Sequence, residues 1–415
     1  MNPSVSIPAI APEKTFDLAV IGAGIVGAAC AWQAQRAGLR VALLEAGEVG
    51  ASATGAGMGH WVVIDEDPAE LALCRLSMQE WAAWGGLAGQ ERTRTGTLWL
   101  AETPAQQAAA LQKAQRLNAA DWPAEWLDAA ALHQAQPGLA PDLLGALWVP
   151  RDEVVYGPGL AAALVREFEA AGGVLLRGFE ALDPSVGQGP AGRDEAEAGV
   201  VHARDGRSVR TGHRLLATGV AAGRWLAAAG LLGSAGSPVI VPRKGQLAIT
   251  DRYPGRLHHA LVELGYIDSA HGDAGESVAF NLQPRASGQW LLGSSRQFDA
   301  PDRTVDMALL GRMVRRAQRF MPGLGDLRVL RCWAGHRPAS IDGRPLIGPV
   351  NAAWSVAAGH EGLGLTTAMG TARLWLDLLL GRPPAIDPRP YDPRRFAGVD
   401  SQRTDAAGLL PEVGQ

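Results

Sequence analysis

The 415-residue sequence contains only three cysteines, Cys30, Cys74 and Cys332, and they are widely spaced. Three thiols at this spacing form neither a disulfide framework nor a zinc or iron–sulfur ligand pattern. We therefore predict no metal site and a reducing, cytoplasmic location, with peripheral attachment to the inner membrane through a partner left open. Residues 1–13 lack a signal-peptide pattern, so these residues and the polar residues 397–415 are expected to be loose termini.

Long apolar runs and excess positive charge are also missing. No apolar stretch approaches the length of a membrane span. The net charge of −4 provides no basic field for nucleic acid. Lysine is scarce, because all but three of the 38 basic residues are arginines. An arginine by itself is therefore weak evidence of function, whereas Lys244 is unusual. The length of the chain indicates two domains.

A strand–turn–helix–strand pattern opens the chain. Residues 16–22 form an apolar run that ends in glycine, which is typical of a buried parallel strand. Residues 24–38 have a helical pattern with a glycine at the end, and residues 40–45 form a second apolar run. Together they predict a βαβ unit.

The turn of this unit carries a possible nucleotide site. Gly22, Gly24 and Gly27 have the spacing GxGxxG, and Glu45 ends the second strand. Gly22 permits a tight turn, Gly24 lets a pyrophosphate approach the helix N-terminus, and Gly27 lets helix and strand pack closely. Glu45 would accept hydrogen bonds from a ribose. The pattern predicts a dinucleotide, with glycines that merely pack a turn as the alternative.

Three further segments favour FAD over NAD. Residues 47–61 are rich in small residues, so their backbone can follow a flat ligand, and Ser52 and Thr54 are candidates for phosphate or flavin contact. A later strand ends in Ala-Thr-Gly at 217–219, a pattern common in flavoproteins with a dinucleotide fold. Residues 359–370 place glycines before a helix, whose N-terminus carries about half a positive charge and could face a flavin. An ordinary loop and a closely packed helix start are the alternatives.

The remaining pattern indicates how the domains are built. Strand patterns dominate residues 239–296 and predict an antiparallel sheet distinct from the parallel unit. We therefore predict an α/β protein, α+β overall, with a Rossmann-like FAD-binding domain and a discontinuous, mainly antiparallel-sheet substrate domain. The predicted FAD-binding domain comprises residues 14–85, 151–235 and 325–396, and the substrate-binding domain comprises 86–150 and 236–324.

Several motifs together resemble one family. They are GAGIVG with Glu45, GASATGAGMG, ATG, VPRKGQL at 241–247, WAGHRPASIDGRPLIG at 333–348, and AAGHEGLG. Over about residues 15–395 the chain resembles the D-amino-acid oxidase/glycine oxidase family of FAD-dependent amine oxidoreductases. The strings GMGHW and GHEGLGLTTA look most like the FAD subunits of bacterial D-hydroxyproline and opine-type dehydrogenases and of cyanide-forming glycine dehydrogenases.

The resemblance assigns roles to individual residues. It implies that Arg337 pairs with a substrate carboxylate, for which a planar guanidinium is suited, although a structural arginine is the alternative. Glycine oxidases carry an arginine where this chain has Glu361 and Gly362, and a tyrosine near Asn281, which puts glycine and sarcosine in doubt. Asn281, Glu361 and His60 become candidate pocket groups. Lys244 is either a cation near the flavin or an exposed lysine on a turn.

The implied reaction oxidises the C–N bond of a small amino acid by hydride transfer to flavin N5, which gives an imine. The expected substrate is a D-amino acid or a cyclic secondary amine such as D-hydroxyproline. The electron acceptor is either oxygen or a quinone or partner redox subunit, so a hetero-oligomer is open. A glycine/sarcosine-type oxidase and a non-catalytic FAD relay subunit are the alternatives.

These inferences define two residue sets. The predicted catalytic residues are Arg337, His60, Asn281 and Lys244. The predicted cofactor-binding residues are Gly22, Gly24, Ile25, Val26, Gly27, Glu45, Ser52, Thr54, Gly57, Met58, Val174, Thr218, Gly219, Arg337, Gly359, His360, Gly362, Leu363, Gly364 and Leu365.

Overall fold

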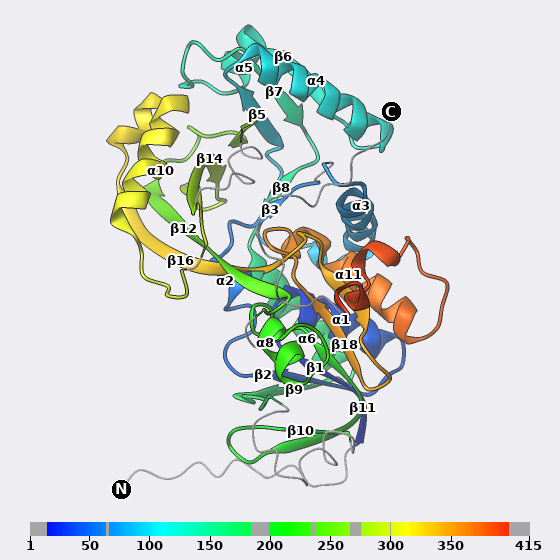
Figure 1. The fold of residues 1–415 in the computed structure, drawn as a ribbon. Coiled ribbons are helices and arrows are strands. Elements are labelled where there is room, and N and C mark those ends of the chain that lie inside the picture. Colours follow the sequence, from blue (N-terminus) through cyan, green and yellow to red (C-terminus); the bar gives the residue numbers. More distant parts are fainter. Residues whose placement is uncertain are drawn as a thin grey trace, which may run out of the picture.

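The computed structural model has two lobes, each built around a large sheet, with a small third sheet between them (Figure 1). The N-terminal strand lies in the lower lobe of the figure, and the chain enters the upper lobe and returns more than once. The predicted loose termini fall outside the described residues, apart from position 397. The structure describes residues 15–63, 66–183, 199–234, 237–265, 275–298 and 300–397.

The first sheet carries the predicted βαβ unit. Its strands are β1 Thr15–Ile21, β2 Val41–Glu45, β9 Val174–Arg177, β10 Val200–His202, β11 Ser208–Leu216, β17 Leu346–Pro349 and β18 Trp354–Ala358. Their order is β17-β18-β11-β1-β2-β9, with β10 also paired to β11. The strands from β18 to β9 pair in parallel, whereas β17 and β10 are antiparallel additions. This topology confirms the predicted Rossmann-like architecture.

Helices cover both faces of this sheet. They are α1 Ile25–Arg36, α3 Pro68–Ala83, α6 Gly157–Ala170, α8 Ala221–Ala228 and α11 Gly364–Leu379. Residues of α1, α3, α6 and α11 share one hydrophobic core with the sheet, and α8 packs in a second core on the opposite face. Ala28, Ala29 and Ala31 of α1 are fully buried, and their small side chains allow α1 to lie close to its neighbours.

The second sheet is mainly antiparallel. Its strands are β5 Thr97–Ala101, β6 Glu125–Asp128, β7 Gly145–Val149, β12 Ile240–Arg252, β13 Ala260–Glu263, β14 Glu276–Pro284, β15 Gln289–Gln297 and β16 Val329–Ser340. Their order is β16-β12-β15-β14-β13-β5-β7-β6, and the β13–β5 pair is parallel. Residues 325–340 were assigned to the FAD-binding domain from sequence, but β16 forms the edge of this sheet because it pairs along its length with β12.

The two faces of the second sheet have different neighbours. The helices of this lobe are α4 Pro104–Ala119, α5 Ala129–Ala135 and α10 Met307–Phe320. Residues of α5 and α10 join one hydrophobic core with the sheet, in which Phe280 stacks on Phe320 with ring centroids 4.8 Å apart. On the opposite face, Trp333 Nε1 donates to the carbonyl oxygen of Ala56 at 3.1 Å. That face therefore meets the first lobe.

Short elements connect the lobes. They are the helix α2 Ala53–Ala56 and the strands β3 His60–Trp61, β4 Arg92–Thr93 and β8 Glu153–Val155, which form a three-stranded sheet. Short 3-10 helices complete the fold at Gly85–Leu87, Pro322–Asp326, Arg389–Tyr391 and Pro393–Phe396. Within the described ranges, no helix combines the length and apolar character needed to cross a membrane.

Candidate active site

The turn after β1 has the geometry that its glycines predict. Gly22 has φ 103°, and a Cβ atom there would lie 2.6 Å from the carbonyl oxygen of Ala217. A Cβ atom on Gly27 would lie 1.9 Å from the carbonyl oxygen of Gly22. Both positions therefore exclude any side chain. A Cβ atom on Gly24 would meet only Thr54 Oγ1, at 3.5 Å. Packing within the protein therefore does not require glycine at position 24.

Polar groups gather around the start of α1. Glu45 Oε2 accepts a hydrogen bond from the Ala23 N–H at 2.7 Å, and Oε1 accepts from the Gly47 N–H at 2.7 Å. Thr54 Oγ1 accepts from the Ile25 N–H at 3.1 Å. Gly24 is the N-cap and supplies no side-chain acceptor. A helix start with a bare glycine cap and a carboxylate beside it fits the pyrophosphate and ribose of a dinucleotide.

A buried hydroxyl extends this cradle. Thr218 Oγ1, just beyond β11 and beside the turn at Gly22, is buried and has no hydrogen-bond partner within the described residues. Gly219 follows Thr218 with φ 58°, a conformation that favours glycine. Because buried polar atoms are rarely left unpaired, this hydroxyl favours a bound group, and the set of residues around the turn fits FAD.

The other predicted cofactor residues fall into three places. Ile25 and Val26 lie in the first turn of α1, and Val174 lies in β9 beside β2. Ser52 is the N-cap of α2, which is followed by Gly57 and Met58. The segment before α11 contains Gly359, His360, Gly362 and Leu363, and Gly364 and Leu365 begin the helix.

His360 is a packing residue in this last segment. Its side chain is buried, and its Nε2 lies 2.9 Å from Thr371 Oγ1. Burial lowers the pKa of His360 to about 3, so the ring is neutral at physiological pH. Gly359 has φ 84° and permits the turn from β18 toward α11. The helix N-terminus thereby reaches the lobe boundary.

Arg337 lies on the face of the second sheet that meets the first lobe. It pairs across strands with Arg243, two residues along from the Gly335–Gly245 pair. Its Nη1 donates to the carbonyl oxygen of Ser295 at 3.1 Å, and the guanidinium lies over Gly245. Among the described residues, no carboxylate lies within salt-bridge distance of Arg337. A guanidinium held in this way has donors left for a ligand anion.

Glycines let this face approach the first lobe closely. A Cβ atom on Gly335 would lie 2.4 Å from the Cβ of Ala56, and one on Gly293 would lie 2.8 Å from Met58 Sδ. Both neighbours belong to the small-residue segment after β2. The sheet face therefore approaches this segment as closely as backbone allows, which brings Arg337 and the predicted flavin-contacting residues to one boundary.

Asn281 lies on the same face, opposite Gly293 in the neighbouring strand. Gln283 Nε2 donates to Asn281 Oδ1 at 3.1 Å and lies 3.9 Å from Met58 Sδ. Gln283 is fully buried, and its Oε1 has no hydrogen-bond partner in the part of the chain that the structure describes. Sequence reasoning missed Gln283, although it follows Asn281 by two positions and so shares its face of the strand.

His60 belongs to a buried polar chain. Its Nε2 lies 2.8 Å from Thr97 Oγ1, and the Thr97 hydroxyl also hydrogen-bonds to Asp152. Burial lowers the pKa of His60 to about 4 and raises the pKa of Asp152 to about 7. The histidine is therefore neutral at physiological pH, whereas the acid titrates near it. Asp152 lies in a turn between two strands and offered no sequence signal.

Lys244 lies on the opposite face of β12 from Arg337. Strand residues alternate between faces, and Lys244 pairs with His336 and not with Arg337. Its Nζ forms an ion pair with Asp302 at 3.1 Å, and its side chain is only 4% exposed. His336 Nε2 lies 2.9 Å from the carbonyl oxygen of Ala300 on that same side. The structure therefore does not bring Lys244 to the other predicted catalytic residues, and it is not an exposed lysine either.

Glu361 is surrounded by arginines. Its Oε2 accepts from Arg243 Nη1 at 2.9 Å, and its Oε1 lies 2.7 Å from Arg296 Nη2. Burial alone would raise the pKa of Glu361, but attraction to Arg296, Arg243 and Arg337 holds it below the ordinary value. Sequence reasoning singled out Glu361 but missed Arg243 and Arg296, which come from strands distant in sequence.

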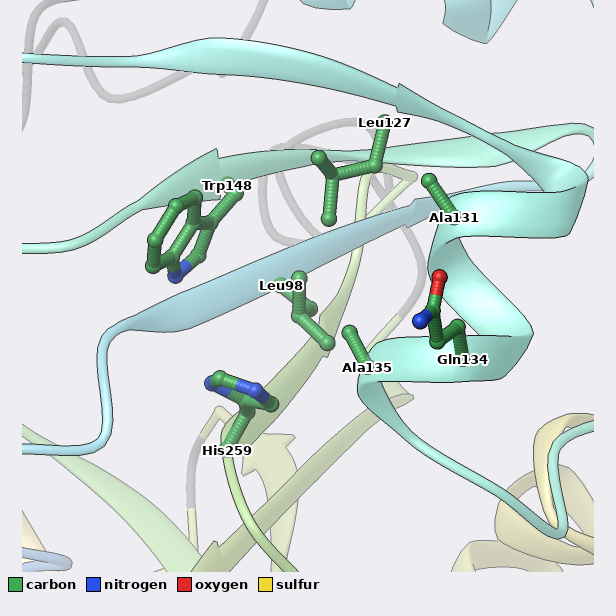
Figure 2. A pocket seen from close by; sticks show the side chains of 7 residues that line it. All are labelled: Leu98, Leu127, Ala131, Gln134, Ala135, Trp148 and His259. Atoms are coloured by element: carbon green, nitrogen blue, oxygen red, sulfur yellow. The ribbon is translucent and has the colours of Figure 1, made fainter.

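Two hollows lie elsewhere. One is a pocket of about 280 Å³. Its lining includes Leu98, Trp148 and His259, whose side chains Figure 2 shows. Leu98 belongs to the core on the α10 side of the sheet, whereas Thr97 points toward His60. A groove of about 370 Å³ lies over α1 and the end of α3. Neither contains a predicted catalytic residue.

The first lobe carries residues that fit a dinucleotide, and the sheet of the second lobe presents Arg337 to it. Together these features define a two-lobed flavin-type oxidoreductase. The chain belongs to the DAO family of FAD dependent oxidoreductases, whose family model matches residues 17–378. Its cofactor is therefore FAD, as the sequence predicts.

Similar proteins cover nearly the whole chain. A glycine oxidase of Bacillus licheniformis is 28% identical over 383 residues, which are 89% of this chain and 95% of that protein. The hydrogen cyanide synthase subunit HcnC of Pseudomonas aeruginosa is 24% identical and covers 92% of this chain and 97% of its own. The crystal structure of glycine oxidase from Geobacillus kaustophilus matches with a TM-score of 0.77 at 25% identity, covering 92% of this chain and all of that one.

Proposed function

We propose that this FAD-dependent oxidoreductase oxidises the C–N bond of a small amino acid, such as a D-amino acid or a cyclic secondary amine like D-hydroxyproline. Bound FAD supplies the chemistry by accepting a hydride from the carbon that bears the amine, and water then hydrolyses the resulting imine. The chain's own residues bind and orient the substrate. The observation that carries the proposal is the position of Arg337.

Arg337 supplies the anchor for a carboxylate. It lies on the sheet face that meets the cofactor lobe, and its guanidinium retains donors after its bond to Ser295. Bidentate pairing with a carboxylate fixes both position and direction, which limits the orientations that the rest of the substrate can take. The guanidinium itself occupies the place that a side chain at Gly245 would take, which fixes its position over the sheet.

The amine end of the substrate would meet the amides of Asn281 and Gln283. The bond from Gln283 Nε2 to Asn281 Oδ1 leaves Gln283 Oε1 as an acceptor without a partner among the described residues. An amine N–H is a donor that would satisfy it. His60 lies on the same boundary as a neutral ring, held by Thr97. Lys244 has no part in this arrangement, since it points to the other side of the sheet.

Glycine or sarcosine oxidation is a second candidate, because glycine oxidases are among the relatives. Asn281, Glu361 and Gly362 stand where we expect glycine oxidases to have a tyrosine and an arginine, so the pocket would recognise the substrate differently. A non-catalytic relay subunit is a third candidate. The open arginine favours catalysis over relay, since an electron relay needs no carboxylate anchor.

Anaerobic reduction of the bound FAD tests the proposal. The purified holoenzyme is mixed with D-hydroxyproline, D-proline, other D-amino acids, their L-forms, sarcosine and glycine, and flavin absorbance is followed. We expect bleaching with at least one D-amino or cyclic secondary amino acid. Bleaching by glycine and sarcosine alone would favour the second candidate, and bleaching by none would favour the relay. Reoxidation by oxygen or by a quinone then separates oxidase from dehydrogenase.

A further inference from the structure

We infer that Arg243 and Arg337 form a double anion site, and that the substrate therefore carries two acidic groups. The inference rests on the proposed function and names the chemical class of its substrate. That class is an amino acid with a second carboxylate, either on its side chain or on the substituent of its nitrogen. Among the substrates of the proposed function it therefore favours an acidic D-amino acid over D-hydroxyproline, which has one carboxylate.

The two arginines are direct cross-strand neighbours. Arg243 of β12 pairs with Arg337 of β16 in an antiparallel register, so both side chains leave the same face of the sheet. Side chains opposite each other in this way start about 5 Å apart, and like charges at such positions repel. An anion between or beside such a pair of guanidiniums therefore stabilises it.

The described protein residues supply one carboxylate for this pair. Glu361 binds Arg243 at 2.9 Å, and it also faces Arg296 at 2.7 Å, so its single charge is shared. Arg243, Arg296 and Glu361 are each less than one-fifth exposed, which makes the interactions strong. Glu361 approaches Arg337 only closely enough for charge attraction, and no salt bridge between them forms.

The backbone around Glu361 indicates that its placement is specific. Glu361 has φ 46°, a left-handed conformation that costs a residue with a side chain about 1 kcal/mol or more. Its N–H donates to the carbonyl oxygen of Pro338 at 2.7 Å, which ties it to the strand that carries Arg337. This strained backbone conformation places the Glu361 carboxylate beside Arg243 and Arg296.

Unsatisfied donors remain after this pairing. Within the described residues, Arg243 Nε is buried and has no hydrogen-bond partner, and Arg337 forms a side-chain hydrogen bond to Ser295 alone. Another acid, Glu70 of α3, lies near enough to Glu361 for charge repulsion. Burial and the neighbouring acids raise the pKa of Glu70 to about 7, so it carries only part of a negative charge at neutral pH. One substrate carboxylate would satisfy Arg337, and a second would satisfy Arg243.

Two non-oxidisable ligands test the inference on the unaltered holoenzyme. Diglycolate carries two carboxylates, and methoxyacetate has the same ether with one. We expect isothermal titration calorimetry to give diglycolate a dissociation constant at least about tenfold lower, the scale of one charge-assisted hydrogen-bonded contact. Equal affinity, or tighter binding of methoxyacetate, would overturn the inference without any variant.

Variants then locate the second anion. We expect Arg243→Gln to abolish the preference for diglycolate over methoxyacetate, and Arg243→Lys to retain part of this preference because the charge remains. Arg252→Gln removes the same charge from an exposed position on the same strand and should change neither affinity. A preference for diglycolate that survives in Arg243→Gln would contradict the assignment. FAD absorbance confirms that each variant is folded.

Oxidation separates this inference from the proposed function. Iminodiacetate and N-methylglycine differ by the second carboxylate, and each is mixed anaerobically with the holoenzyme. Faster bleaching by iminodiacetate, or by D-aspartate and D-glutamate over D-alanine, supports two acidic groups. Faster bleaching by the monocarboxylates overturns the inference but leaves the proposed function intact. If neither kind of amine bleaches the flavin, the proposed function itself fails.

Discussion

The guanidinium of Arg337 lies directly over Gly245, so that a Cβ atom at position 245 would be 2.6 Å from Nη1. Gly245 and Arg337 come from adjacent strands. Because Gly245 has no side chain, the Arg337 guanidinium can occupy the space above it. This arrangement explains why a glycine occurs in the middle of the long strand β12, where glycine otherwise weakens a strand.

Gly245→Ala should therefore displace Arg337 without unfolding the protein, because the end of a long side chain can move. We expect kcat/KM to fall about tenfold, mainly through a higher KM, since the carboxylate anchor shifts. Steady-state kinetics and FAD content measure the two effects. Gly311→Ala, on the helix α10 far from the site, should change neither quantity. Loss of FAD together with activity would point to a structural role for Gly245.

Arg337→Ala should remove the anchor altogether. We expect kcat/KM for the best amino-acid substrate to fall by at least about 100-fold, on the scale of 3 kcal/mol for the loss of a charged hydrogen-bonded partner. The FAD absorbance spectrum and photochemical reduction of the flavin should be unchanged, which shows that the cofactor site is intact. Kinetics equal to those of the unaltered enzyme would exclude carboxylate binding by Arg337.

Two glycines of the nucleotide turn should respond differently to alanine. Gly27→Ala places a methyl group 1.9 Å from the Gly22 carbonyl oxygen, so we expect the apoprotein itself to be destabilised. Gly24→Ala meets only Thr54 Oγ1 at 3.5 Å and should leave apoprotein stability unchanged, but it should weaken FAD binding at the helix start. Thermal unfolding of apoprotein and quenching of FAD fluorescence separate these effects. Equal FAD affinity in Gly24→Ala would place the pyrophosphate elsewhere.

Asp152 should make stability depend on pH. Burial raises its pKa from 3.8 to about 7, so between about pH 4 and pH 7 the folded state holds a proton that the unfolded chain releases. The bound proton stabilises the folded state relative to the unfolded chain. This stabilisation is complete at low pH and is lost as the pH rises toward 7. Urea unfolding should therefore show that Asp152→Asn gains about 3 kcal/mol relative to the unaltered protein between pH 5 and pH 8. Parallel pH profiles would contradict the prediction. His60 has the opposite slope, but it is present in both proteins.

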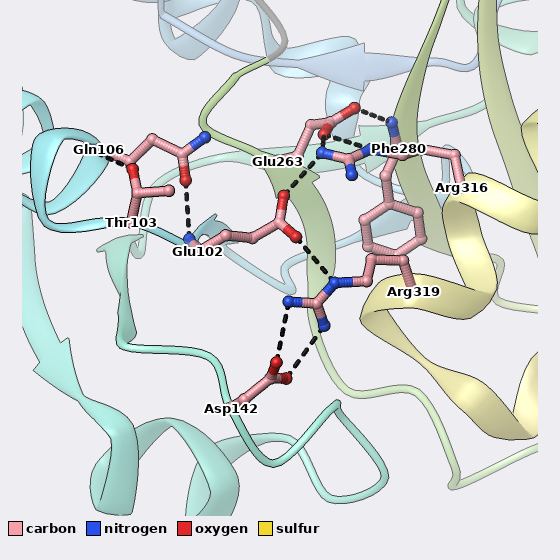
Figure 3. A network of polar contacts seen from close by, with 8 residues as sticks. All are labelled: Glu102, Thr103, Gln106, Asp142, Glu263, Phe280, Arg316 and Arg319. Carbon is pink, nitrogen blue, oxygen red and sulfur yellow. Dashed lines mark hydrogen bonds and ion pairs between the residues drawn. The ribbon is translucent and has the colours of Figure 1, made fainter.

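A network of ion pairs fixes α10 to the second sheet (Figure 3). Arg316 Nε donates to Glu263 Oε2 at 2.8 Å, and its Nη2 donates to Glu102 at 2.7 Å. Glu263 is only 3% exposed and accepts from the Phe280 N–H. Arg319 continues the network to Glu102 and Asp142.

Arg316→Met should therefore cost about 3 kcal/mol of unfolding free energy, because it leaves the buried Glu263 carboxylate without its cation. Adding Glu263→Gln should recover part of this loss, since the amide oxygen still accepts from Phe280 without a charge. Urea unfolding of the single and double variants measures the coupling. Additive losses would mean that the two side chains do not stabilise each other.

Local sequence pattern was sufficient for much of the cofactor lobe. The turn glycines and Glu45 lie within one βαβ unit, so their spacing along the chain fixes their spacing in space. The strand β1 and the helix α1 were predicted close to their observed bounds because their periodicity is local. The family and the cofactor follow from these motifs, and both are confirmed.

The substrate face could not be predicted in the same way. Arg243, Arg337 and Glu361 meet only because β12 pairs with β16 and the segment before α11 returns beside them. Lys244 illustrates the difficulty, since its neighbour Arg243 faces the site while Lys244 faces away. The sequence determined the βαβ unit, its glycines and the FAD cofactor, because those depend on residues close along the chain. The tertiary structure decided which charged side chains share a face, because strand register and pairing between distant segments place them.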